Sequence, residues 1–175
     1  NRPVQQELAE LFKIKELQQG LFKNFLSQPY PAPIWPGDQN RRYVFCGRFV
    51  KEKNLEGLLH VWKAFSSERN NVQLIVLGDG PLASSHHQLA SDLDLKVGFT
   101  ADDNEADILF LGLVARPEDY MANARALVVP SRNEGTPTVI IMALLLGLPV
   151  IAADSNGGCI KDMLGPHGLE GQANE

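Results

Sequence analysis

The stretch from Val128 to Ala153, VVPSRNEGTPTVIIMALLLGLPVIAA, tells most about the fold of this chain. It begins and ends with short apolar runs next to proline, which predicts two buried β-strands. The apolar segment between them starts at Thr136-Pro137-Thr138, and proline is well tolerated there because the first N–H groups of a helix have no partner. The stretch therefore predicts a strand, a helix and a second strand, the unit from which parallel sheets are built.

The same alternation runs through the rest of the chain. Apolar runs predict five strands, RYVFCG (42–47), VQLIVLG (72–78), DILFLG (107–112), ALVVP (126–130) and PVIAAD (149–154). Helical spacing predicts helices at 54–67, near 86–93, at 117–124, after Thr136 and near Cys159. The acidic segment 94–107 has no such spacing, and we expect an exposed loop or a small excursion there. Continuous Val, Ile and Leu in strands that alternate with helices indicate a doubly wound, parallel α/β sheet covered on both faces.

The first part of the chain has a different pattern. Apolar residues between Val4 and Leu26 recur every three or four positions, which predicts an amphipathic helix. A proline-rich segment follows at 27–40 and predicts an irregular connector. We therefore expect a helical segment with its connector over residues 1–36 and one α/β domain over 37–175. Because the chain lacks an initiator Met and ends in a polar tail, we expect part of a longer protein, truncated at its C-terminal end.

Composition excludes several classes of function. The chain has 175 residues, 44% of them apolar, and a net charge of −5, which indicates a globular domain without attraction to nucleic acid. No apolar run reaches the roughly 18 residues that a bilayer requires. Two cysteines are too few for a disulfide framework, which favours the cytoplasm. The four histidines lack metal-ligand spacing, and we expect the adjacent His86 and His87 to have a surface role.

Ligands of doubly wound sheets bind beyond the carboxyl ends of the strands, so the turns there are the candidate sites. In the turn from Gly47 to Asn54, the glycine allows close approach of the backbone to a ligand. Arg48 and Lys53 lie near the start of the next helix, whose N–H groups favour an anion. This turn predicts a phosphate or diphosphate site, although two solvated surface cations would give the same pattern.

Two further turns carry candidate residues. Gly78-Asp79-Gly80 resembles part of a dinucleotide fingerprint, but the third glycine and the downstream acid are not evident, so a tight turn explains it equally well. Glu134 precedes the helix that starts at Thr136, and we expect it to be exposed at the mouth of that helix. The carboxylate is suited to accept hydrogen bonds from a sugar, or it is simply a favourable charge near the first turn.

Five motifs in order, GRxxxxKN, VLGDGPL, FLGLV, VPSxxEG and GLPVIA, resemble the C-terminal half of retaining glycosyltransferases of the GT-B fold, the glycogen-synthase and mannosyltransferase-like group. The resemblance covers about Tyr43 to Gly158. It implies a Rossmann-like domain that binds a nucleotide-diphosphate sugar and faces an acceptor-binding domain absent here. It implies neither metal nor cofactor, and membrane association only through the missing half.

The resemblance also assigns roles to residues. Arg48 and Lys53 would neutralise the departing diphosphate, and Glu134 would contact the transferred sugar, so these three are the predicted catalytic residues. The predicted donor-binding residues are Gly47, Gly78, Asp79, Leu113, Val114, Gly135, Thr136, Thr138 and Met142.

The sequence departs from the family's pattern at Met142, where the family has a second glutamate eight residues after the first. A thioether is a poor acceptor for ribose hydroxyls, so weakened donor binding is expected. This departure leaves open a degenerate, non-catalytic GT-B module with a role in assembly or regulation. A GT-B-like epimerase or a pyridoxal-dependent phosphorylase is a further alternative, and the incomplete glycine fingerprint makes a dinucleotide oxidoreductase the least favoured.

Overall fold

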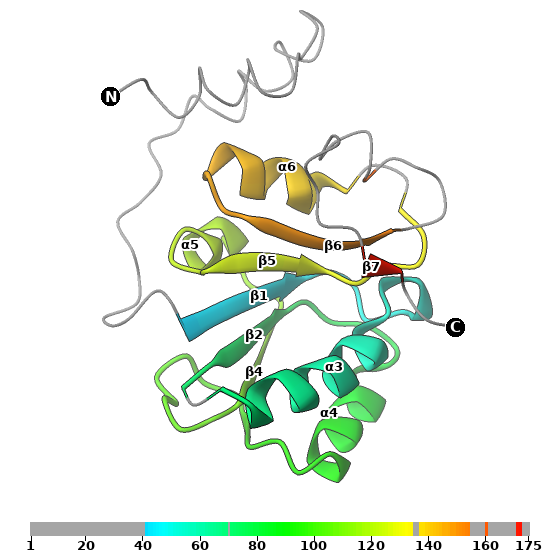
Figure 1. The fold of residues 1–175 in the computed structure, drawn as a ribbon, viewed down its shortest axis with the longest axis vertical. Helices are drawn as coiled ribbons and strands as arrows, with labels where there is room; N and C mark the ends of the chain where they lie inside the picture. Colours follow the sequence, from blue (N-terminus) through cyan, green and yellow to red (C-terminus); the bar gives the residue numbers. More distant parts are fainter. Residues whose placement is uncertain (1–40, 70, 135–136, 155–159, 161–170, 173–175) are drawn as a thin grey trace, which may run out of the picture.

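The computed structural model describes residues 41–69, 71–134, 137–154, 160 and 171–172 (Figure 1). The predicted N-terminal helix and connector, and the predicted last helix near Cys159, lie outside these residues. The described elements, in chain order, are β1 (Arg42–Cys46), η2 (Lys51–Lys53), α3 (Leu55–Ser67), β2 (Gln73–Leu77), α4 (Ala83–Asp92), β3 (Val97–Gly98), β4 (Ile108–Gly112), α5 (Pro117–Met121), β5 (Ala126–Val129), α6 (Thr138–Leu145), β6 (Val150–Asp154) and β7 (Gly171–Gln172).

The strands form one parallel sheet, as the sequence predicts. Its order is β3-β4-β2-β1-β5-β6, and the short β7 pairs with the end of β6. Strand β1 lies in the middle of the sheet (Figure 1). After β1 the chain proceeds outwards on one side to β2 and β4, and it returns to the other side of β1 as β5. The direction of winding therefore changes between β1 and β5, and such a change opens a crevice at the carboxyl edge of a sheet.

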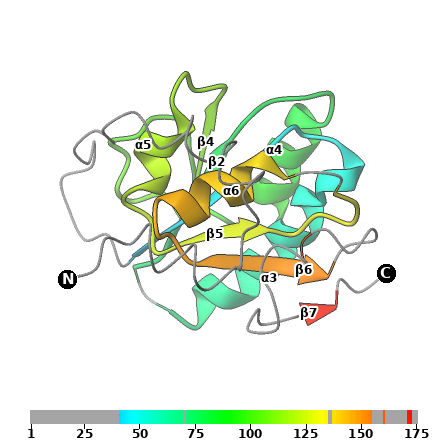
Figure 2. The same ribbon diagram turned by 90° about the horizontal axis from the view of Figure 1, so that it is seen from above.

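Alternate side chains of β1, β2, β4 and β5 enter two separate cores. On β1, Val44 packs with apolar residues of α5 and α6, whereas Phe45 packs with those of α3 and α4. Figure 2 shows α3 and α6 on opposite sides of the strands. Both faces of the sheet are thus covered, which confirms the doubly wound architecture.

Several element boundaries differ from those expected. The helix expected near 86–93 begins earlier, at Ala83, and the one expected at 117–124 ends at Met121. The first turn of the former, Ala-Ser-Ser-His, has no large apolar residue, so the start of this helix carries little periodic signal. The helix after Glu134 begins at Thr138, one residue beyond Pro137. Strand β3 lies inside the acidic segment expected to be a loop, and with two residues it is too short to show a period.

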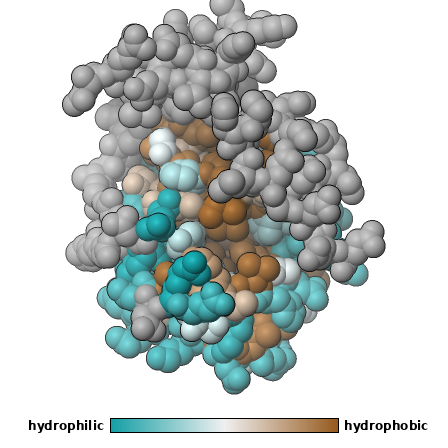
Figure 3. All heavy atoms as spheres, in the orientation of Figure 1, coloured by the Kyte–Doolittle hydropathy of each residue, from teal (hydrophilic) through white to brown (hydrophobic). Residues whose placement is uncertain are grey.

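The surface seen in Figure 3 is polar over much of its lower part, and apolar side chains gather towards the middle. Among the described residues, the large apolar side chains with the most exposure include Leu113 at 81% and Ile151 at 49%. No helix in the described part of the chain has the length and apolar character required to cross a membrane.

Candidate functional site

Three strand-to-helix turns pack against one another at the carboxyl edge of the sheet. The turn after β1 is held to the turn after β2, because the Phe49 N–H donates to the Asp79 carbonyl at 2.9 Å. The Gly78 N–H in turn donates to the Gly112 carbonyl at the end of β4, at 2.8 Å. These backbone contacts give the edge a fixed shape.

Two glycines at this edge, Gly78 and Gly80, lie where the turns approach so closely that a side chain would not fit. Gly78 has φ +131°, and a Cβ there would lie 1.9 Å from the Gly47 carbonyl oxygen. A Cβ at Gly80 would lie 2.6 Å from the carbonyl oxygen of Phe49. Asp79 stabilises the same turn, since its Oδ1 accepts the Gly80 N–H at 2.7 Å. Close packing of the two turns therefore accounts for Gly78 and Gly80, and nucleotide contact by these residues stays a prediction.

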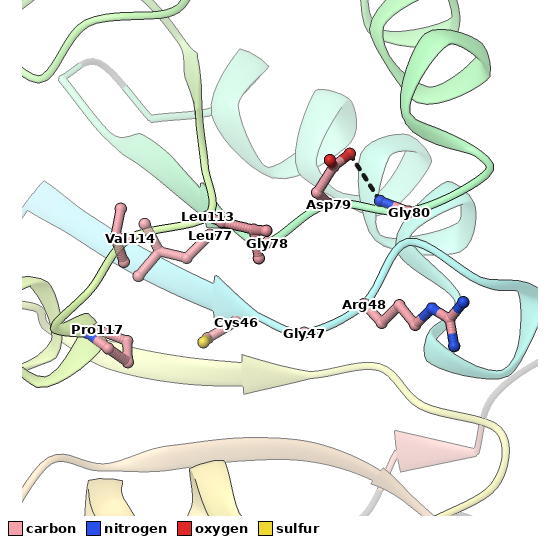
Figure 4. A pocket seen from close by; sticks show the side chains of 10 residues that line it. All are labelled: Cys46, Gly47, Arg48, Leu77, Gly78, Asp79, Gly80, Leu113, Val114 and Pro117. Carbon is pink, nitrogen blue, oxygen red and sulfur yellow. Dashed lines mark hydrogen bonds between the residues drawn. The ribbon is translucent and has the colours of Figure 1, made fainter.

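A cavity of about 500 Å³ opens between these turns (Figure 4). The residues that line it are Cys46, Gly47, Arg48, Leu77, Gly78, Asp79, Gly80, Leu113, Val114 and Pro117. Figure 4 shows Val114 and Pro117 at one end, Arg48 at the other, and Gly47 and Gly78 between them. The size falls in the range of small-molecule sites, and the cavity brings together six of the predicted residues, from all three turns.

Cys46 is a lining residue that the sequence did not single out. Burial, with the nearby Glu118 carboxylate as a smaller cause, raises the pKa of its thiol to about 11. The thiol is therefore neutral near pH 7 and acts as a small apolar surface rather than as a nucleophile. Its place directly before Gly47, at the end of a strand, was the available signal.

Lys53 and Glu134 form an ion pair. The Lys53 Nζ lies 2.7 Å from Oε1 and 2.8 Å from Oε2 of Glu134, a residue 81 positions later in the chain. The Glu134 side chain is 6% exposed and that of Lys53 is 28% exposed. The expectation that Glu134 is exposed is therefore wrong. An ionised carboxylate at this depth requires a partner, and Lys53 supplies it.

The ion pair lies beside the cavity. A Cβ on Gly47 would be 3.8 Å from the Lys53 Cδ, so the lysine stem passes next to a glycine that lines the cavity. Arg48 is exposed, whereas Lys53 is partly buried. Arg48 and Lys53 thus both lie near Gly47, but Arg48 faces solvent and Lys53 does so only in part.

The remaining predicted residues belong to α6 and the turn before it. Gly135 and Thr136 lie outside the residues that the structure describes. Thr138 is the first residue of α6 and is exposed. Met142 is half-buried and packs against the core between the sheet, α5 and α6. A thioether there provides packing and no strong hydrogen-bond acceptor.

A second cavity, of about 590 Å³, lies next to α4 and β3, and its lining includes His87, Lys96 and Phe99. It lies along β3 at the outer end of the strand order, and none of its lining residues is a predicted site residue, whereas ligands of doubly wound sheets bind at the carboxyl edge where the winding changes. We therefore take the first cavity as the candidate site, although the second is slightly larger.

His86 is buried, with 4% exposure, so the expected surface role is wrong for this residue. Its ring packs edge-on against Phe49, with centroids 5.6 Å apart. Burial lowers the pKa of the imidazole, an effect that His87 reinforces and Glu56 opposes. Within the described residues no group of three or more His, Cys, Asp or Glu side chains is arranged to hold a metal ion.

A doubly wound parallel sheet with its crevice at the carboxyl edge defines a Rossmann-like domain. The profile of the family described as Glycosyl transferases group 1 matches residues 40–173. The chain therefore belongs to this family.

Named relatives agree with this membership. The chain is 32% identical over 134 residues to the putative teichuronic acid biosynthesis glycosyltransferase TuaC of Bacillus subtilis, which covers 75% of this chain and 28% of TuaC. It is 33% identical over 108 residues to the putative glycosyltransferase EpsF of the same organism, with 62% and 26% covered. Five curated relatives, these two among them, are matched over 26% to 41% of their own length.

A solved structure supports the fold. The structure of HepE from Anabaena, in complex with UDP and glucose, superposes with a TM-score of 0.62 at 23% identity. The match covers 91% of this chain and 38% of HepE.

Proposed function

We propose that this chain is the C-terminal, donor-binding half of a retaining GT-B glycosyltransferase. It would bind a nucleotide-diphosphate sugar, and the complete enzyme would transfer the hexosyl group to an acceptor. The observation that carries the proposal is the Lys53–Glu134 ion pair beside an apolar cavity at the carboxyl edge of the sheet. A nucleotide sugar offers the matching chemistry, since it joins a flat base, a dianionic diphosphate and a polyhydroxylated ring.

The cavity suggests how the donor lies. The base would rest against Leu113 and Val114, where apolar surface is available. The diphosphate would pass over Gly47 towards Arg48 and Lys53. Negative charge grows on the diphosphate as the bond to the sugar breaks, and cations already in place lower the barrier by stabilising that charge.

Glu134 would then contact the transferred sugar. The ion pair gives this almost fully buried carboxylate an opposite charge as its partner. Each carboxylate oxygen has more than one lone pair, so sugar hydroxyls can donate to Glu134 while Lys53 stays bound. Lys53 would thus bind the diphosphate and Glu134 the sugar, the two groups that the breaking bond joins.

Met142 supports a second candidate, a degenerate module with a role in assembly or regulation. Its packing against the core leaves no charged acceptor at this position of α6. Hydrogen bonds to a charged group contribute about 1.5–3 kcal/mol, so their loss would weaken nucleotide binding about ten- to a hundredfold.

Calorimetric titration of the chain with UDP, GDP and ADP separates the two candidates. We expect saturable binding of one nucleotide, weakened at least tenfold in Lys53→Ala and strengthened in Met142→Glu. A folded Lys63→Ala variant is the matched control, because Lys63 is in α3, is not a lining residue of the cavity, and its Nζ donates to the Asp94 carbonyl. If neither the chain nor Met142→Glu binds any nucleotide while both remain folded, the degenerate module is favoured.

The proposal extends to the complete protein. The chain spans well under half of the length of its relatives, so an acceptor-binding domain would have to supply the rest of the site. We expect the chain alone to bind the donor without transferring sugar, in the cytoplasm and with no metal or cofactor.

A further inference from the structure

We propose that Asn54 is a positioning residue that holds Lys53 against Glu134 before a ligand arrives. The part of this inference that concerns nucleotide affinity rests on the proposed function. The part that concerns the ion pair stands on the described contacts alone.

Three consecutive residues after β1 each contact a residue of the segment after β5. The pairs are Glu52–Arg132, Lys53–Glu134 and Asn54–Pro130. The Glu52 carbonyl accepts the Arg132 N–H at 2.8 Å. The Asn54 Nδ2 donates to the Pro130 carbonyl at 3.2 Å. Lys53 lies between the two residues that make these contacts, and Glu134 follows both of their partners in the chain. The residues on both sides of Lys53 are therefore tied to the segment that carries Glu134.

The identity of residue 54 fits two requirements. Its backbone is left-handed, with φ 51° and ψ 38°, between η2 and α3. Glycine and asparagine adopt this conformation most readily, but only asparagine also carries an amide that can donate. The backbone of Asn54 thus turns the chain, and its side chain donates to the Pro130 carbonyl.

Gly57 leaves room for that side chain. A Cβ at Gly57 would lie 2.8 Å from both Nδ2 and Oδ1 of Asn54. Alanine at position 57 would therefore displace the Asn54 amide, although alanine is a better helix former than glycine inside α3.

Holding Lys53 in place matters because its side chain is long and has many rotamers. A free lysine loses this freedom when it binds a phosphate, and the loss weakens binding. If Asn54 fixes the pair beforehand, the donor meets a cation whose position is already set.

The ammonium signal of Lys53 in the ¹H–¹⁵N spectrum of labelled protein reports the pair directly, because protons in a shielded ion pair exchange slowly with water. Lys53→Ala identifies the signal by its loss. We expect the signal in the wild-type chain and its loss in Asn54→Gly, which keeps the left-handed turn. The matched control is Asn71→Gly, at another left-handed asparagine with φ 71°, which should keep the signal.

Gly57→Ala separates positioning from stability. This variant should be about as stable as the wild type, because the helix propensity of alanine offsets the loss of the Asn54 hydrogen bond, whereas Asn54→Gly should be slightly less stable. Positioning predicts that both lose the Lys53 signal. A signal that is absent from the wild type, or that persists in both variants, overturns the proposal.

Nucleotide affinity gives the second measurement. Loss of one neutral hydrogen bond predicts about two- to tenfold weaker binding of the preferred nucleoside diphosphate in both variants, with Asn71→Gly unchanged. Wild-type affinity in both variants would contradict a role in ligand binding. If the wild type binds no nucleotide but the Lys53 signal behaves as expected, the donor site fails and the positioning role of Asn54 stands.

Discussion

At the scale of single residues, Gly78 controls how closely the turns after β1 and β2 approach. An added Cβ would meet the Gly47 carbonyl oxygen at 1.9 Å, and the backbone there has a positive φ. We expect Gly78→Ala to lower the free energy of unfolding by about 3 kcal/mol or more in urea titrations. Gly112→Ala is the control, because Gly112 also has a positive φ but nothing within 4 Å, and it should cost about 1–2 kcal/mol. Equal losses would show that the close approach of the turns is unimportant.

The sequence predicted the residues of the site better than their contacts. Gly47, Arg48, Gly78, Asp79, Leu113 and Val114 line one cavity because parallel strands end at a common edge, which follows from the pattern of strands. The burial of Glu134 could not be predicted in this way. It depends on a partner 81 residues away, and no local pattern reports such a pair. The buried His86 was missed for a related reason, because its neighbour Phe49 lies in another turn.

At the scale of elements, α4 has two buried residues, His86 and Ala90, and the His86 ring contacts Phe49, next to Arg48 in the turn after β1. Burial lowers the pKa of His86 below its ordinary value of 6.5, so the unfolded chain takes up this proton first as the pH falls. Stability from this group is present above about pH 6.5 and is lost on acidification. We expect the free energy of unfolding to fall less between pH 7.5 and pH 5 in His86→Leu than in the wild type. Urea titrations at the two pH values measure this difference.

The replacement itself should be mild at pH 7.5, about 1.5 kcal/mol or less, because the Nδ1 of His86 has no hydrogen-bond partner among the described residues. His60→Leu, at an exposed position of α3, is the control. An unchanged pH dependence in His86→Leu would show that another group causes the acid sensitivity.

Elements were predicted well where they are long and apolar. Strands β1, β2, β4, β5 and β6 are continuous apolar runs, so the sequence located each of them within one or two residues. The pieces η2, β3 and β7 have two or three residues each, too few for any periodicity. The strands β3 and β7 are defined by the strands with which they pair, and a pattern along the chain does not contain this information.

At the scale of the whole molecule, the order of the strands creates the site. The chain leaves β1 in one direction and returns on its other side as β5, so the turns that carry Lys53 and Glu134 meet next to the cavity formed by the turns after β1, β2 and β4. Membership of the group 1 glycosyltransferases gives this arrangement a chemical context. We therefore expect a nucleoside diphosphate to occupy this edge of the sheet.

The sharpest test is to follow the backbone amide signals of the ¹⁵N-labelled chain while UDP, GDP and ADP are added in turn. We predict that one nucleotide shifts the signals of Gly47, Gly78 and Val114, and leaves those of His87 and Phe99 at the second cavity unchanged. Shifts concentrated at the second cavity, or no shift with any of the three nucleotides, would contradict a donor site at the carboxyl edge.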